Sequence, residues 1–158
     1  YVREHVIIPV PHPLPKDQER QQAAFVTLIK GEAQRGCVGS LVPLQPTLAG
    51  ELISNALAAA VRDPRFTPVK PEELIELEYA IDLIEELAPL ASPAELDPAC
   101  EGVVVRADKR VGVALPATSG LETAALQIRY ALQRAEIDPS ERYRMERFRV
   151  MRVTTLSQ

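Results

Sequence analysis

A cysteine between two glycines is the residue of this sequence best placed to do chemistry. Cys37 lies in the stretch Gln34-Arg35-Gly36-Cys37-Val38-Gly39. Alternate side chains of a β-strand share one face, so Arg35, Cys37 and Gly39 would point the same way. A neighbouring guanidinium favours the thiolate, and Gly39 would leave room for a ligand. If Arg35 lies beside an accessible Cys37, alkylation of Cys37 should persist at pH values below the usual thiol pKa of about 8.5. In Arg35→Ala the pH dependence of alkylation should move to higher pH.

Packing explains the same residues without chemistry. Free cysteine is often buried, and strand glycines mark bulges or the close approach of a helix. A nucleophile also needs a base, and the two histidines, His5 and His12, lie in a proline-rich lead that nothing places near Cys37. Three interpretations therefore stay open, namely a packing device, a ligand or partner site that contains Cys37, and covalent catalysis by Cys37.

A helix and a turn downstream of the cysteine supply further candidates. Asp63 precedes a proline and is typical of a helix stop. Arg65 is suited to gripping a carboxylate or phosphate, or to pairing with Asp63. The candidate site thus has Cys37 as its catalytic residue and, as ligand-binding residues, Gln34, Arg35, Gly36, Val38, Gly39, Asn55, Asp63 and Arg65.

Motifs for the common cofactors are missing. The sequence has no Walker loop, no G-x-G-x-x-G, no H-E-x-x-H and no G-x-S-x-G. Cys37 and Cys100 lie far apart without nearby histidines, which makes a poor zinc set. We expect neither a cofactor nor a metal, and we expect both thiols to be reduced.

Composition is that of a globular protein, which we expect to be cytoplasmic because no apolar run suits a membrane span or a signal peptide. Of the 158 residues, 46% are hydrophobic and 25% are charged, which fits one domain over 1–158 with a proline-rich lead over 1–23. The net charge of −4 gives no global attraction to nucleic acid or to an anionic membrane, and no apolar run is long enough to span a bilayer. The oligomeric state is left open.

Charge is nevertheless unevenly placed along the chain. Acidic residues crowd 72–86, and five arginines fall in 142–152. We interpret these segments as two solvated faces able to attract each other. The alternative is an RNA-binding patch built from the C-terminal arginines.

Hydrophobic periodicity and turn signals give the elements. Strands are predicted over 24–29 and 33–42, and a helix runs from an N-cap at Thr47 to Asp63-Pro64. Periodicity leaves 74–87 undecided between helix and strand. A hairpin over 103–105 and 111–115, a helix opened by Ser119-x-x-Glu122 and a bulged strand over 143–153 follow. No internal repeat is evident.

Two motifs in this order resemble the AMMECR family. That family is marked by a Leu-Arg-Gly-Cys-Ile-Gly strand, here Gln34 to Gly39, and by a helix that ends in Asp-Pro-Arg-Phe, here Asp63 to Phe66. The likeness continues through 73–83, which the resemblance makes a strand, and through 102–105, 112–116 and the last helix. Gln34 replaces the usual leucine, the N-terminal helix is reduced to the proline-rich lead, and a tryptophan common near the C-terminus is absent.

The resemblance implies a fold and partners but no reaction. It implies an α/β (α+β) fold of two subdomains, with mixed sheets of strand hairpins packed by two main helices. It also implies association with Memo-like and radical-SAM-type proteins. The leading hypothesis is an accessory protein that binds a ligand or partner in a cleft lined by the Cys37 strand. A cysteine-dependent enzyme and an RNA-binding module are the alternatives.

Overall fold

The computed structural model describes residues 1–155, which form two compact units. Unit 1 comprises residues 1–84 together with 151–155, and unit 2 comprises 85–150. Strands β3 and β6 each run from one unit into the other. Six strands hydrogen-bond in the order β2-β1-β3-β6-β4-β5.

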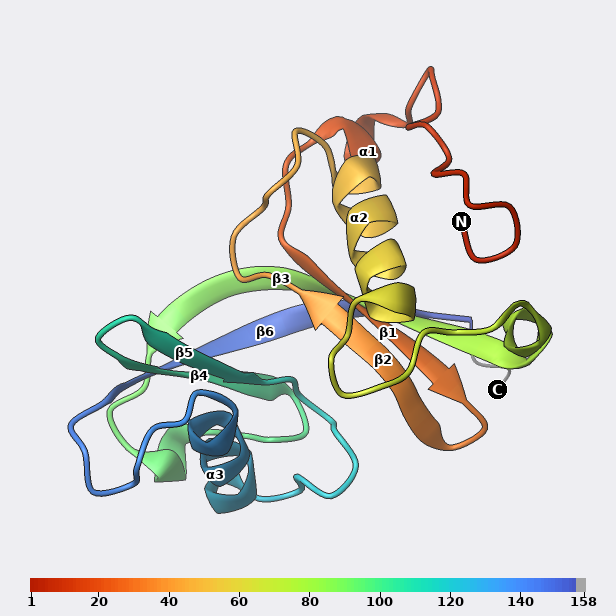
Figure 1. The fold of residues 1–158 in the computed structure, drawn as a ribbon. Helices are drawn as coiled ribbons and strands as arrows, with labels where there is room; N and C mark the ends of the chain where they lie inside the picture. The colour runs from red at the N-terminus through yellow and green to blue at the C-terminus, as the bar shows by residue number, and fades with distance from the viewer. Residues whose placement is uncertain (156–158) are drawn as a thin grey trace. The chain divides into compact units, whose positions relative to one another are not determined.

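Unit 1 is a β-hairpin covered by a helix. It contains α1 (Lys16–Glu19), β1 (Ala24–Lys30), β2 (Ala33–Gly39), α2 (Leu48–Val61), the 3-10 helix η1 (Pro71–Glu76) and the first part of β3 (Leu77–Pro89). Helix α2 begins where the Thr47 hydroxyl accepts a 3.1 Å hydrogen bond from the Gly50 N–H, and it ends just before Asp63-Pro64. Figure 1 shows α2 lying over the β1–β2 hairpin. The core between these layers contains Val26, Leu28, Ala59, Val69 and Leu77.

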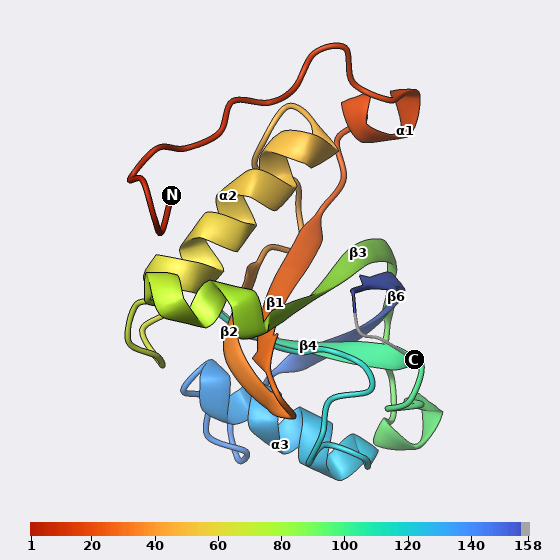
Figure 2. The same ribbon diagram turned by 90° about the vertical axis from the view of Figure 1, so that its right-hand side faces the viewer.

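Unit 2 is also a hairpin covered by a helix. It contains the rest of β3, the 3-10 helix η2 (Pro93–Glu95), β4 (Glu101–Ala107), β5 (Arg110–Ala114), α3 (Ala124–Arg134) and most of β6 (Arg144–Thr154). Figure 2 shows α3 beside β4. The core of this unit is made of buried aliphatic residues that include Val103, Val105, Ile128 and Leu132.

The order of elements repeats, although the sequence carries no repeat. Each unit reads strand, strand, helix, strand, with β1, β2, α2 and β3 in one and β4, β5, α3 and β6 in the other. The strand order β2-β1-β3-β6-β4-β5 is accordingly symmetrical about β3 and β6. In the first repeat β1 pairs antiparallel with β2 and with β3, and in the second repeat β4 pairs antiparallel with β5 and with β6.

A glycine sits under the helix at the same place in both repeats. Gly36 pairs with Leu28, and a Cβ added at Gly36 would overlap the carbonyl oxygen of Ala59 in α2. Gly112 pairs with Val105, and a Cβ added there would overlap the carbonyl oxygen of Ala131 in α3. Each glycine therefore lets a helix approach the hairpin closely, because any side chain would push that helix away.

The expected α+β class, two subdomains and two main helices are confirmed. The segment 74–87, which periodicity left undecided between helix and strand, contains both: η1 ends at Glu76 and β3 begins at Leu77. The expected capping box at Ser119 is wrong: the N-cap of α3 is Thr123, whose hydroxyl accepts from the Leu126 N–H at 3.2 Å, while Glu122 bonds the Gly120 N–H. Strand β6 pairs with β4 without a register shift over 144–149, so the expected bulge is absent from that pairing.

Candidate functional site

The exposed edge of β2 is clamped at Cys37 by the turn that follows α2. Strand β2 ends the strand order, so one side of its backbone has no strand partner. The Cys37 N–H donates to an Asp63 carboxylate oxygen at 2.9 Å, and an Arg65 terminal nitrogen donates to the Cys37 carbonyl at 2.9 Å. The clamp satisfies backbone groups that would otherwise attract another strand.

Asp63 and Arg65 also hold each other. Two nitrogens of the Arg65 guanidinium donate to the two Asp63 oxygens at 2.9 and 2.6 Å, and the Arg65 N–H adds a third bond at 3.1 Å. Burial alone would raise the pKa of Asp63, but the bonds from Arg65 and from the Cys37 N–H hold that pKa at about 2. With its amide oxygen turned toward the guanidinium, Gln34 accepts from Arg65 at 3.2 and 3.3 Å.

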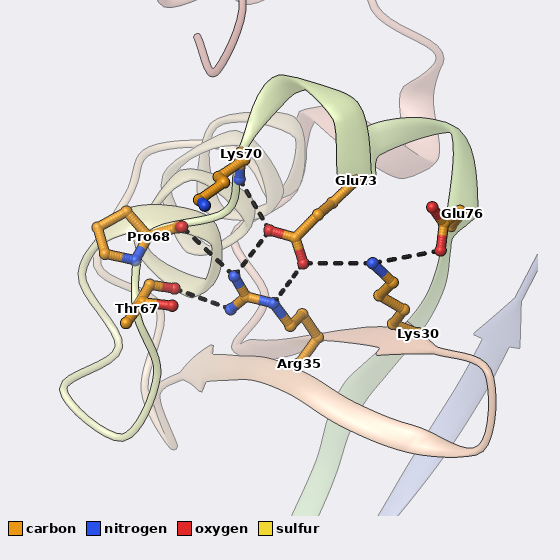
Figure 3. A network of polar contacts seen from close by, with 7 residues as sticks. All are labelled: Lys30, Arg35, Thr67, Pro68, Lys70, Glu73 and Glu76. Carbon is orange, nitrogen blue, oxygen red and sulfur yellow. Dashed lines mark hydrogen bonds and ion pairs between the residues drawn. The ribbon is translucent and has the colours of Figure 1, made fainter.

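Arg35 is held by a second carboxylate (Figure 3). Its Nε and Nη2 donate to the two oxygens of Glu73 in η1 at 2.9 and 3.0 Å, and the carbonyls of Thr67 and Pro68 accept two more bonds. The Lys70 N–H also donates to Glu73, at 2.9 Å. The hydrogen bonds from Arg35 and then from Lys70 lower the pKa of Glu73 to about 2. Lys30 approaches the same carboxylate and that of Glu76, at 3.6 and 3.2 Å.

The Cys37 thiol does not have the electrostatic surroundings expected from the sequence. Burial raises its pKa above the ordinary thiol value, while a hydrogen bond from the Thr27 hydroxyl, at 3.2 Å, and the charge of Arg65 act in the opposite direction. The arginine that influences the thiol is therefore Arg65 rather than Arg35, whose guanidinium is engaged by Glu73. The expected Arg35-lowered thiol pKa is wrong for this reason.

Other motif residues have packing contacts. Gly36 lies under α2, and Val38 packs against the unit 1 core. A Cβ at Gly39 would overlap Ala24 and Phe25, so these residues fill the room expected there for a ligand. The Asn55 amide donates to the Ala24 carbonyl at 3.0 Å and to Glu51 at 3.3 Å, which makes it a buried tie between α2 and β1.

Two carboxylates that position these elements were not among the expected site residues. Glu51 is 1% exposed and accepts from the Ser40 hydroxyl and from the N–H groups of Leu44 and Gln45. Glu73 anchors Arg35 as described above. The sequence offered only an acidic run around Glu73, because a contact 38 positions away leaves no periodic pattern.

An apolar groove of about 820 Å³ lies in unit 1 beside α2. The N-terminal segment runs alongside the helix (Figure 2). It forms one wall with Val6, Ile7 and Ile8, all more than half exposed. Leu52 and Ala56 of α2 form another wall, and the groove is lined by few charged side chains.

An ion pair joins the two charged segments, and its acid is buried rather than part of the expected solvated face. Arg152 pairs with Asp82, and both lie in unit 1. Within unit 2, Arg147 and Arg149 lie 3.5 and 3.7 Å from Glu101. These arginines are thus partly neutralised by carboxylates, which weakens the case for an RNA-binding patch.

Residues 1–155 contain neither a metal-binding cluster nor a membrane-spanning helix. In that range no three histidine, cysteine or acidic side chains are grouped so as to hold a metal ion. The helices of the same range are all too short or too polar to cross a bilayer.

Comparisons with known proteins agree with the fold and the motif. The AMMECR1 family model matches residues 1–154. A Thermotoga maritima protein is 39% identical over 157 residues, covering 94% of this chain and 90% of its own length. A Clostridium acetobutylicum protein is 36% identical over 135 residues, covering 85% of this chain but only 29% of its own length.

A solved structure shares the fold. The crystal structure of an uncharacterised protein from Pyrococcus horikoshii superimposes with a TM-score of 0.82 at 24% identity, over 92% of this chain and 79% of that one. A Thermococcus gammatolerans protein is 35% identical over 126 residues, and this chain spans 61% of its length. Because the family model covers nearly the whole chain, the protein belongs to the AMMECR1 family.

Proposed function

We propose that this chain is a ligand- or partner-binding accessory protein, and that the Gln34–Gly39 strand with the Asp63–Phe66 turn forms a wall of its binding site. The observation that carries the proposal is the clamp on Cys37. Asp63 and Arg65 hold the strand edge through the Cys37 backbone, and Glu73 holds the adjoining Arg35. Such a fixed frame is suited to recognition, because binding then requires little further ordering.

The state of the thiol supports binding more than covalent catalysis. The Thr27 hydroxyl donates a hydrogen bond to the sulfur and is no base at neutral pH. Burial raises the thiol pKa, so the nucleophilic thiolate is scarce. A cysteine-dependent enzyme would need a ligand or a partner to supply the missing base.

Relatives of greater length support the accessory role. The matched part of the Clostridium acetobutylicum protein is 29% of that chain, so a domain like this one occurs there beside a much larger remainder. Memo-like and radical-SAM-type proteins are the partners that the family resemblance suggests.

Binding to purified candidate partners tests the proposal. The chain would be mixed with a Memo-like or a radical-SAM-type protein from the same organism and the complex measured by analytical ultracentrifugation. We expect one of them to bind, and Asp63→Asn to weaken that binding about tenfold, because the clamp is loosened. Asp138→Asn is the matched control, since Asp138 also precedes a proline but bonds only within its own turn, to Ser140 and Glu141. Absence of any complex with both partners, or turnover of a small substrate by the chain alone, would refute the proposal.

A further inference from the structure

One face of the unit 1 sheet gathers polar side chains that the motif alone did not suggest. Cys37 on β2 pairs with Thr27 on β1, and Thr27 pairs with Ala80 on β3. One step along the same face, Phe25 pairs with Asp82. Alternate residues share a face, so the Cys37 thiol and the Asp82 carboxylate belong to the same side of the sheet. Val26 and Leu28 belong to the other side, which packs against α2.

Asp82 holds an arginine at this face. The Asp82 side chain is fully buried, and its two oxygens accept from Nε and Nη2 of Arg152 at 2.6 and 2.9 Å. About a third of the Arg152 side chain is exposed, at 35%. A buried ion pair contributes little net stability, because desolvating the two charges offsets their attraction. What the pair does provide is a guanidinium fixed in position by two parallel bonds.

The thiol and this guanidinium are electrostatic neighbours. The hydrogen bonds that Arg152 donates to Asp82 are the largest influence on the pKa of Arg152 and raise it, burial lowers it, and the charges of Asp82 and Cys37 raise it further. Asp82 in turn contributes to the raised pKa of Cys37, after burial. The partly exposed Arg152, the half-buried thiol and the Thr27 hydroxyl thus form one cluster, and the charge of Arg65 also acts on its thiol.

We propose that Arg152, positioned by Asp82, binds the anionic group of a small-molecule ligand next to the Cys37 thiol. A carboxylate, a phosphate and a sulfonate all match a guanidinium fork, so the anionic group is the shared chemistry. The proposal rests on the proposed function, because it takes the Cys37 strand as a wall of the binding site. It adds a ligand class and two residues, Asp82 and Arg152, to that site.

Charge-matched thiol reagents test the anion preference directly. In Cys100→Ser, Cys37 is the remaining cysteine, and it would be treated with an anionic sulfonatoethyl or a cationic trimethylammonioethyl methanethiosulfonate. In each reaction the thiolate attacks the reagent's sulfenyl sulfur, a mixed disulfide forms and methanesulfinate leaves. The ratio of the two rate constants cancels the fraction of thiolate, so it reports the local charge alone.

The same ratio is measured at the exposed Cys100 in Cys37→Ser. We expect the ratio of the anionic to the cationic rate constant to be about tenfold higher at Cys37 than at Cys100. Arg152→Met should reduce this excess, and the charge of Arg65 accounts for what remains. Arg144→Met, also on β6 and exposed, is the matched control and should leave it unchanged. Inorganic phosphate, compared with chloride at equal ionic strength, should slow the anionic reagent at Cys37 more than at Cys100.

Each alternative result has a defined meaning. Equal ratios at Cys37 and Cys100, or a ratio that Arg152→Met leaves unchanged, would overturn the anion site while leaving the partner-binding proposal intact. A Cys37 that reacts with neither reagent until the chain is unfolded would overturn the anion site and the assignment of the strand as a binding wall. If Arg152→Met does not fold, the comparison of Cys37 with Cys100 in folded protein still decides the anion preference.

Discussion

Units 1 and 2 share a strand-strand-helix-strand order, and they differ at the residue that follows the buried glycine. In unit 1, Gly36 precedes Cys37, and in unit 2, Gly112 precedes Val113. Both helices begin at a threonine N-cap, Thr47 or Thr123, and both are followed by an Asp-Pro pair. The glycine, the cap and the stop therefore belong to the shared architecture.

What only unit 1 contains is the clamp. Asp63 reaches across to the Cys37 N–H, whereas Asp138 accepts from the N–H and hydroxyl of Ser140 in its own turn. In unit 2 the corresponding loop is tied instead through Glu141 to Arg110. Packing alone accounts for the glycines, since a unit without the cysteine has one too. It does not account for Cys37, Asp63 and Arg65 together, which is why these residues carry the proposed site.

The largest expected effect concerns the feature that the units share. Gly36→Ala and Gly112→Ala should each lower the free energy of unfolding by about 3 kcal/mol, because the new Cβ overlaps a helix carbonyl and the helix must shift. Urea denaturation of both variants measures this. Gly120→Ala is the control: nothing lies within 4 Å of its added Cβ, so only the strain of a φ of +82° remains, about 1 kcal/mol. A large loss in one unit and none in the other would contradict the comparison.

The next effect separates the two Asp-Pro turns. Asp63→Asn should cost about 2 kcal/mol at neutral pH, since the pKa of Asp63 falls from 3.8 to about 2 in the folded chain. A lowered pKa means that the ionised form is stabilised by folding. The contribution is therefore present above pH 4 and is lost as the pH falls toward 2.

Denaturation at a series of pH values measures this contribution. The difference between wild type and Asp63→Asn should shrink as the pH is lowered through that window. Asp138→Asn should leave stability almost unchanged, because its bonds are local and exposed. A pH-independent difference for Asp63→Asn would mean that the carboxylate charge is not what matters.

A smaller effect is expected from the Arg35–Glu73 pair. Arg35→Met and Glu73→Gln should each cost about 1 kcal/mol, because the two partners are 15% and 17% exposed and solvent screens part of their attraction. A double-mutant cycle in urea gives the coupling energy between the two side chains.

Alkylation of Cys37 should keep the same pH dependence in Arg35→Met, because Glu73 engages that guanidinium. In Arg65→Met the alkylation should move to higher pH, because a charge that favours the thiolate is lost. If the pH dependence of alkylation moved in Arg35→Met but not in Arg65→Met, Arg35 would be the arginine that acts on the thiol, as the sequence suggested.

The fold was more accessible from sequence than the site was. Thr47, Asp63-Pro64 and the β-branched and aromatic run over 24–29 report local backbone preferences, and they predicted α2 and β1 closely. The helix start at Thr123 was missed because Ser119 and Glu122 have the spacing of a capping box four residues earlier. The face shared by Arg35 and Cys37 followed from strand geometry, but the partner of Arg35 did not, because Glu73 is brought in by a long-range contact. The pairing of Asp82 with Arg152, 70 positions apart, left only an acidic run and a basic run in the sequence.

The smallest effect on stability is expected where the proposed effect on function is largest. Cys37→Val gives unit 1 the residue that unit 2 has at the corresponding position, Val113, and valine is a β-branched residue suited to a strand. The substitution removes the sulfur that accepts from the Thr27 hydroxyl, so we expect a loss of at most about 1 kcal/mol. The backbone clamp from Asp63 and Arg65 does not involve the thiol and should persist.

Sedimentation with the candidate partners and urea denaturation would be run on the same preparation. Near-native stability with weakened binding is the expected pair of results, because the thiol then contributes to recognition and little to packing. Native binding in Cys37→Val would show that this difference between the units is a packing variation, whereas a loss of several kcal/mol would make the cysteine a core residue of unit 1.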